Sequence, residues 1–195
     1  MKILIDPGHG HNTPGKCSPD KTFYEWIFNR KIASSLVERL KDLGYDAERI
    51  VTGENDISLL ERCLRVNAWC SKLGKKNVLL VSIHANAAGN GGWHTARGWS
   101  VYVAKNCSAA SKILAQSLFA AADARGLRGN RSIPSEHYWQ ANFTIISRTN
   151  CPAVLTENLF YDNREDLAIL KSEDGERQIV ELHVEGIINY LAANG

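Results

Sequence analysis

The sequence lacks several features that would place it in a specialised class of protein. The longest nearly uncharged apolar stretch, Val78 to Ala88, contains His84 and is shorter than the ~20 residues of a membrane span. The net charge is only +2, so no strongly basic surface for nucleic acid is indicated. Glycine and proline are too few for a disordered or collagen-like chain. We therefore expect an ordinary globular protein with neither a membrane nor a nucleic acid as its partner.

Paired cysteine motifs and an export signal are also missing. The five cysteines are scattered and form no Cys-x-x-Cys pair, which argues against a disulfide framework or a structural zinc cluster. Near the N-terminus, Asp6 and Pro7 interrupt the apolar stretch that a signal peptide requires. We expect synthesis in the cytoplasm, so that any action outside it depends on release or on unconventional export.

Strand and helix patterns alternate along the chain without a repeat or a linker, which predicts one domain over residues 1–195. Short apolar runs predict strands, and apolar residues at helical spacing that stop at a glycine predict helices. The alternation predicts an α/β fold with a mostly parallel sheet and helices on both faces. The expected strands are 2–6, 45–51, 78–83, 99–104, 143–146 and 153–156, and the expected helices are 23–43, 58–73, 109–125, 163–170 and 176–191.

Three expected strands end at a residue that can bind a metal or move a proton. His9 follows the first strand, His84 ends the third, and Glu157 ends the last. Ligands of a parallel sheet bind beyond the carboxyl ends of its strands, so these side chains should converge. Glu25 joins them if the loop 11–21 folds back over that edge. Two histidines and a carboxylate form a common catalytic zinc set, which leaves Glu157 as general base and acid.

Several segments around these residues form one recognisable pattern. They are Asp6-Pro7-Gly8-His9-Gly10, Glu25 opening a helix, Ser82-Ile83-His84-Ala85-Asn86, Pro152 to Phe160, and Leu60, Arg62 and Asn67 in an L-x-R-x-x-x-x-N pattern. Together they resemble a known family, the zinc-dependent N-acetylmuramoyl-L-alanine amidases of the type-3 class, found in cell-wall hydrolases and phage endolysins, over essentially the whole chain. The resemblance implies a single domain with a twisted sheet of about six strands. It also implies one zinc ion held by His9, Glu25 and His84, with Glu157 as the catalytic residue.

The resemblance implies a peptidoglycan hydrolase. A zinc-activated water would cleave the amide between the lactyl group of N-acetylmuramic acid and L-alanine of the stem peptide. Asn86, beside His84, and Arg131 and His137, in the irregular segment 128–142, are predicted to contact the substrate. A holin-type partner is one route by which the enzyme would be released to the wall.

The residues leave alternatives open at the site. His11 offers a His-x-His pair with His9 and could bind the metal in its place. Thr22 and Glu25 have the spacing of a capping box, in which the glutamate would bond to the helix start. Leu159 stands where the family usually carries glycine, which adds a side chain beside the catalytic acid.

Two other functions remain possible at this stage. A zinc peptidase that cuts within the stem peptide would use the same site residues. A module that binds the wall without catalysis would keep the fold, although the complete set of two histidines and two glutamates argues against it.

Overall fold

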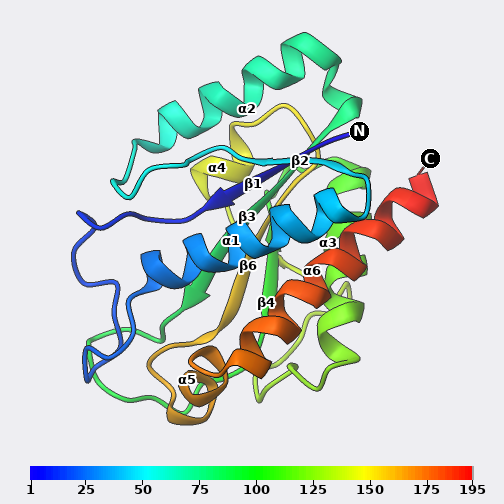
Figure 1. Cartoon of the computed structure of the whole chain (residues 1–195). Coiled ribbons are helices and arrows are strands. Elements are labelled where there is room, and N and C mark those ends of the chain that lie inside the picture. The colour runs from blue at the N-terminus through cyan, green and yellow to red at the C-terminus, as the bar shows by residue number, and fades with distance from the viewer. Residues whose placement is uncertain (195) are drawn as a thin grey trace.

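The computed structural model describes residues 1–194 and contains one six-stranded sheet in the order β2-β1-β3-β6-β4-β5 (Figure 1). The first four strands in this order are parallel, β4 runs antiparallel to β6, and β5 is parallel to β4. The predicted α/β fold with a mostly parallel sheet is confirmed. The strands are β1 (Lys2–Pro7), β2 (Asp46–Arg49), β3 (Val78–Asn86), β4 (Ser100–Val103), β5 (Trp139–Gln140) and β6 (Ala153–Phe160).

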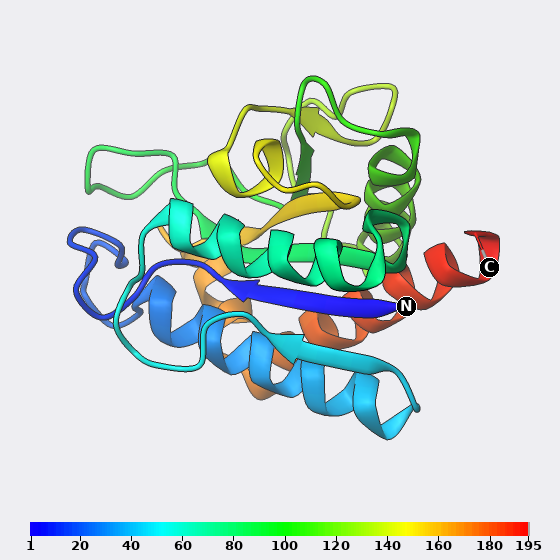
Figure 2. The ribbon, with the colours of Figure 1, turned by 90° about the horizontal axis from the view of Figure 1, so that it is seen from above.

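Helices cover both faces of the sheet (Figure 2). Successive strand residues point to opposite faces, so Ile3 and Ile5 join the core under α1, α3 and α6, whereas Leu4 joins the core under α2 and α4. No helix within residues 1–194 is long and apolar enough to cross a membrane. The helices are α1 (Glu25–Asp42), α2 (Leu59–Leu73), a short 3-10 helix (Lys75–Asn77), α3 (Ala109–Asp123), α4 (Thr144–Ser147), α5 (Arg164–Leu170) and α6 (Glu173–Asn194).

One predicted strand is wrong. Residues 143–146 were expected to be extended, but the helix α4 begins at Thr144. A strand would turn Ile145 and Ile146 to opposite faces, whereas the helical turn buries both in the core that α2 covers. A short apolar run does not distinguish the two structures by its pattern. In contrast, β3 and β6 are longer than predicted and extend through His84 and Glu157.

The helices α3 and α6 pack closely because α6 carries a glycine at their contact. A Cβ atom built on Gly186 would lie 2.7 Å from Cα of Leu118 in α3. Real Cβ atoms do not approach backbone so closely, so a larger residue would push the two helices apart.

We predict that Gly186→Ala lowers the free energy of unfolding by about 1–3 kcal/mol, because overpacking outweighs the gain in helix propensity. Urea denaturation measures the change. Gly53→Ala is the control, since no heavy atom lies within 4 Å of a Cβ built there. An alanine at 186 that leaves stability unchanged or raises it would contradict this account of the helix contact.

Candidate metal centre and catalytic site

Three predicted metal ligands meet at the carboxyl edge of the sheet. His9 lies two residues after the end of β1, His84 lies in β3, and Glu25 is the first residue of α1. Nε2 of His9 lies 3.4 Å, and Nδ1 of His84 lies 3.0 Å, from the Glu25 carboxylate oxygens. One ligand atom from each residue lies within 4.8 Å of the others. Zinc binds nitrogen and oxygen at about 2.0–2.2 Å, so the cluster is compact enough for one ion.

The backbone around His9 brings its imidazole into edge-to-face contact with that of His84, with ring centroids 4.9 Å apart. His9 is in the left-handed region, with a φ of 60°, which non-glycine residues seldom adopt. Arg30 and Arg62 hold it there, donating to the His9 carbonyl oxygen at 2.8 and 3.2 Å. A Cβ on Gly8 would lie 2.1 Å from Cε1 of His84. Glycine at this position therefore leaves the space that the His84 ring occupies.

Glu25 faces the site and does not cap its own helix. Tyr24 is the N-cap residue of α1, and no side chain caps this helix. Oε1 of Glu25 accepts a hydrogen bond from the backbone N–H of Ala85 at 3.2 Å and lies against His84. The capping-box interpretation of Thr22 and Glu25 is therefore wrong, because the carboxylate bonds across to β3.

Burial and mutual contact set the charges of these three residues. Burial lowers the pKa of His9 to about 4, so its imidazole is neutral near pH 7. Burial also acts to lower the pKa of His84, but the hydrogen bond with Glu25 raises that pKa overall. The contact with His84 likewise outweighs the burial of Glu25 and lowers the pKa of that carboxyl. His9 and Glu25 are therefore in the neutral and the ionised form that bind metals, whereas the raised pKa of His84 means that a metal competes with a proton for its imidazole.

Glu157 lies beside this cluster on the neighbouring strand. It pairs with His84 in the ladder between β3 and β6. Burial raises the pKa of Glu157 to about 7. Within the described part of the chain, its Oε2 is buried and has no hydrogen-bond partner. A carboxyl group with a free oxygen and a pKa near neutrality can both accept and donate a proton.

A β-bulge in β6 follows Glu157. His84 pairs with Glu157 but Asn86 pairs with Phe160, so β6 has one extra residue here. Leu159 lies in this bulge with a φ of 64° and a buried side chain. Glycine adopts this conformation without strain, which gives a physical reason for glycine at this position in the amidase pattern. Leu159 adopts the left-handed backbone although it carries a side chain.

The three residues that are predicted to contact the substrate have different neighbours in the structure. The Asn86 side chain accepts a hydrogen bond from the following backbone N–H at 2.9 Å. Arg131 reaches back to β4 and donates to Ser100 Oγ at 3.1 Å. The ring of His137 stacks on Phe119 of α3, with centroids 5.0 Å apart. Contact of these residues with substrate stays a prediction.

Two other histidines have clear structural partners. His11, the alternative ligand, contacts Asn55 Oδ1 through Nδ1 at 3.2 Å and is exposed. His183 is buried, and its Nε2 contacts the Thr156 hydroxyl at 3.0 Å. The cluster with metal-ligand spacing contains His9 and not His11.

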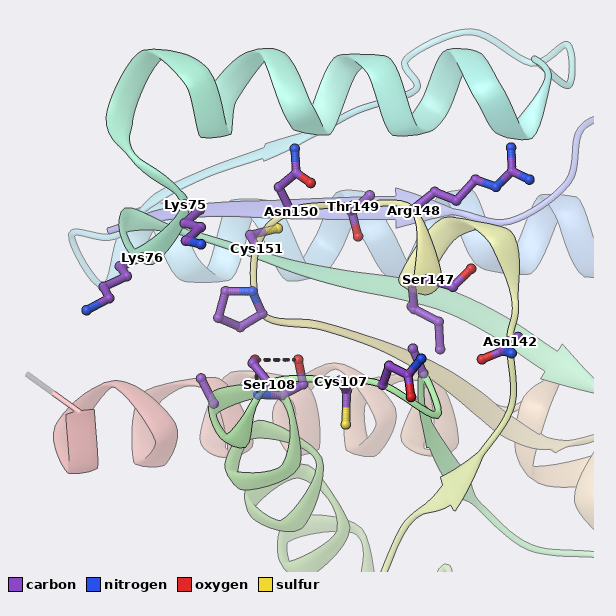
Figure 3. Close-up of a pocket in the computed structure, with 16 residues that line it drawn as sticks. Lys75, Lys76, Cys107, Ser108, Asn142, Ser147, Arg148, Thr149, Asn150 and Cys151 are labelled. Carbon is purple, nitrogen blue, oxygen red and sulfur yellow. Dashed lines mark hydrogen bonds between the residues drawn. The ribbon is translucent and has the colours of Figure 1, made fainter.

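A cavity of about 440 Å³ opens over the cluster. Its walls include both histidines, Leu59 at the start of α2 and Ile145 of α4, but not Glu25 or Glu157, so it separates the two histidines from these helices. A larger cavity of about 720 Å³ lies where β3 and β6 begin, at the opposite edge of the parallel strands. None of the predicted site residues lines it; Figure 3 shows its lining, including Lys75, Ser108, Asn142, Arg148 and Cys151.

Comparison with known proteins identifies the family. A family model described as N-acetylmuramoyl-L-alanine amidase matches residues 3–189. The chain belongs to the N-acetylmuramoyl-L-alanine amidase family. Its resemblance to these amidases is therefore confirmed across nearly the whole sequence.

Relatives and solved structures agree with this membership. The endolysin of Bacillus phage SPP1 is 27% identical over 97% of this chain, which spans 65% of the endolysin. The amidase CwlM of Bacillus licheniformis is 27% identical over 96% of this chain, which spans 67% of CwlM. The crystal structure of an N-acetylmuramoyl-L-alanine amidase from Clostridium difficile 630 is similar, with a TM-score of 0.83 and 29% identity, covering 100% of this chain and 98% of that one.

Sequence reasoning missed a buried charge network beneath His9. Arg62 of α2 donates to the carboxylate of Asp6 and, at 2.7 Å, to that of Asp56. Ser82 donates to the other Asp6 oxygen at 2.7 Å. A signal was available, because Arg62 lies one helical turn from Val66 on the buried face of α2. A cation on an apolar helix face indicates a buried ionic partner.

We predict that Arg62→Ala lowers the free energy of unfolding by about 3–5 kcal/mol, because Asp6 stays buried without its cation. Urea denaturation measures the loss. Arg177→Ala is the matched control, since Arg177 pairs with Asp174 on the exposed surface of α6. Equal effects of the two substitutions would show that the network does not support the fold.

Proposed function

We propose that the protein is a zinc-dependent N-acetylmuramoyl-L-alanine amidase. It hydrolyses the amide between the lactyl group of N-acetylmuramic acid and L-alanine of the stem peptide. The observation that carries this proposal is the cluster of His9, Glu25 and His84 beside the partnerless buried oxygen of Glu157. Membership of the amidase family supplies the class of substrate.

Zinc suits this donor set. Two imidazole nitrogens and one carboxylate form a common catalytic zinc set that leaves a coordination position open, whereas calcium and magnesium prefer oxygen ligands. Beside the cluster, Oε2 of Glu157 is buried and has no hydrogen-bond partner among the described residues. This supports a site that binds a further ligand. When bound, zinc lowers the pKa of water and polarises a carbonyl oxygen.

The residues of the site have separate roles in the reaction. Glu25 and the two histidines hold and orient the ion. Glu157 Oε2 accepts the proton of the attacking water and returns it to the L-alanine nitrogen as the C–N bond breaks. The pKa of about 7 that burial gives Glu157 suits both transfers near neutral pH.

Peptidoglycan also sets the place of action, which we infer to be the cell wall. One similar protein is named as an endolysin. Release by a holin-type partner would bring such an enzyme from the cytoplasm to its substrate.

We predict that Glu157→Gln slows hydrolysis of purified peptidoglycan by about 10²–10⁴-fold, because the amide accepts no proton. Zinc content, measured on the same sample, should stay at the level of the unmodified protein. Glu181→Gln, at an exposed glutamate that pairs with Arg39, controls for loss of one carboxylate.

Mass spectrometry of the released products completes this test. An amidase frees intact stem peptides with an L-alanine amino terminus. Shortened peptides would indicate a zinc peptidase, and an unmodified protein that binds walls but releases nothing would indicate an inactive module. Full activity of Glu157→Gln would contradict the role of Glu157.

A second prediction concerns the metal. Chelation with o-phenanthroline should abolish activity and added zinc should restore it.

The ligand assignment is tested by substitution. His9→Asn should weaken zinc binding more than about 100-fold, which exceeds the loss of affinity caused by substituting residues that only contact a metal ligand. Asparagine tolerates the left-handed backbone at this position. His11→Asn is the matched control and should bind zinc normally. Chelator competition measures both affinities, and the reverse order would assign the ligand to His11.

A further inference from the structure

Arg131 lies on the same face of the sheet as the catalytic residues. Ser100 of β4 pairs with Glu157 of β6, and directly opposite residues point to the same face. Tyr102, two residues after Ser100, also shares this face. Arg131 donates to the Ser100 hydroxyl at 3.1 Å and to the Tyr102 hydroxyl at 3.4 Å. Its guanidinium therefore lies over β4, one strand away from Glu157.

Among residues 1–194, no carboxylate forms an ion pair with Arg131. The charge of Arg131 acts on the Glu157 carboxylate without such a pair. Its guanidinium carbon lies 4.8 Å from the centre of the Trp139 ring and 5.4 Å from that of Phe160. Arginine has five N–H donors, of which the two hydroxyls occupy two. A half-buried guanidinium with donors to spare is suited to bind a carboxylate.

The separation of Arg131 from Glu157 is comparable with the length of one peptide residue beyond the scissile bond. Neighbouring strands are about 4.8 Å apart, and an extended peptide advances about 3.3–3.6 Å per residue. A carboxyl group on the residue after L-alanine is therefore within reach of Arg131 when the amide lies beside Glu157.

We propose that Arg131 binds a carboxylate of the stem peptide, on the residue that follows L-alanine, and makes the site selective for peptides in which this carboxyl is free. This inference rests on the proposed amidase function. A neutral carboxamide at the same place would accept a hydrogen bond but would leave the guanidinium charge unpaired.

Two synthetic muropeptides test the inference, identical except that the residue after L-alanine carries a free carboxyl or a carboxamide. The zinc-loaded protein should hydrolyse the acid with a kcat/KM about tenfold above that of the amide, mainly through KM. In Arg131→Gln this ratio should fall to about one, and Arg131→Lys should keep part of it. Arg128→Gln, at an exposed arginine of the neighbouring turn, should leave the ratio unchanged.

The outcomes separate selectivity from structural support. Equal rates of the unmodified protein on the two substrates would overturn the inference without any variant. A ratio that stays near ten in folded Arg131→Gln would also overturn it, because Arg131 would then only brace the loop against β4. Hydrolysis of both muropeptides at the amide bond, with no preference, would leave the proposed function standing. Hydrolysis of neither would overturn the proposed function and this inference together.

Discussion

The geometry of the site depends on the buried guanidinium of Arg62. It binds Asp6 near the end of β1 and the carbonyl oxygens of Pro7 and His9, and so joins α2 to the loop that carries the first candidate ligand. Only 2% of Arg62 is exposed. A buried cation is tolerated when anions and carbonyls surround it, and removing one member would leave another unpaired. The backbone at His9 therefore cannot relax without disturbing the contact between α2 and the sheet.

On the other side of β3, the bulge of β6 fixes the second histidine. Asn158 is fully buried; its Nδ2 donates to the His84 carbonyl oxygen at 2.9 Å, and its Oδ1 accepts from Trp99 Nε1 at 2.7 Å. Bulges commonly re-aim side chains beside active sites. Glu157 faces the candidate site, and Asn158, on the opposite face of β6, bonds to Trp99 in the core. The left-handed Leu159 allows this change of register.

The sequence predicted the parallel sheet and the meeting of His9 and His84 because these features follow from strand order and from the common edge of parallel strands. Glu25 was placed with them by the resemblance to the amidases. The sequence did not predict the state of residues 143–146, since a short apolar run suits a strand and a helix equally. It also left Glu25 between two roles, because the spacing from Thr22 describes only local bonds. The fold brings Ala85 and His84 within reach of Glu25, and that long-range contact overrides the local capping signal. The sequence did not predict the charge network of Arg62 for the same reason, because Asp6 is distant from Arg62 in sequence.

Burial also makes the site suitable for proton transfer. Desolvation raises the pKa of Glu157 to about 7, and the nearby Glu25 carboxylate contributes to this increase. Two carboxylates flanking a histidine pair are costly when both are buried. A divalent cation held by Glu25 and the histidines would neutralise part of this repulsion and favour the ionised form of Glu157.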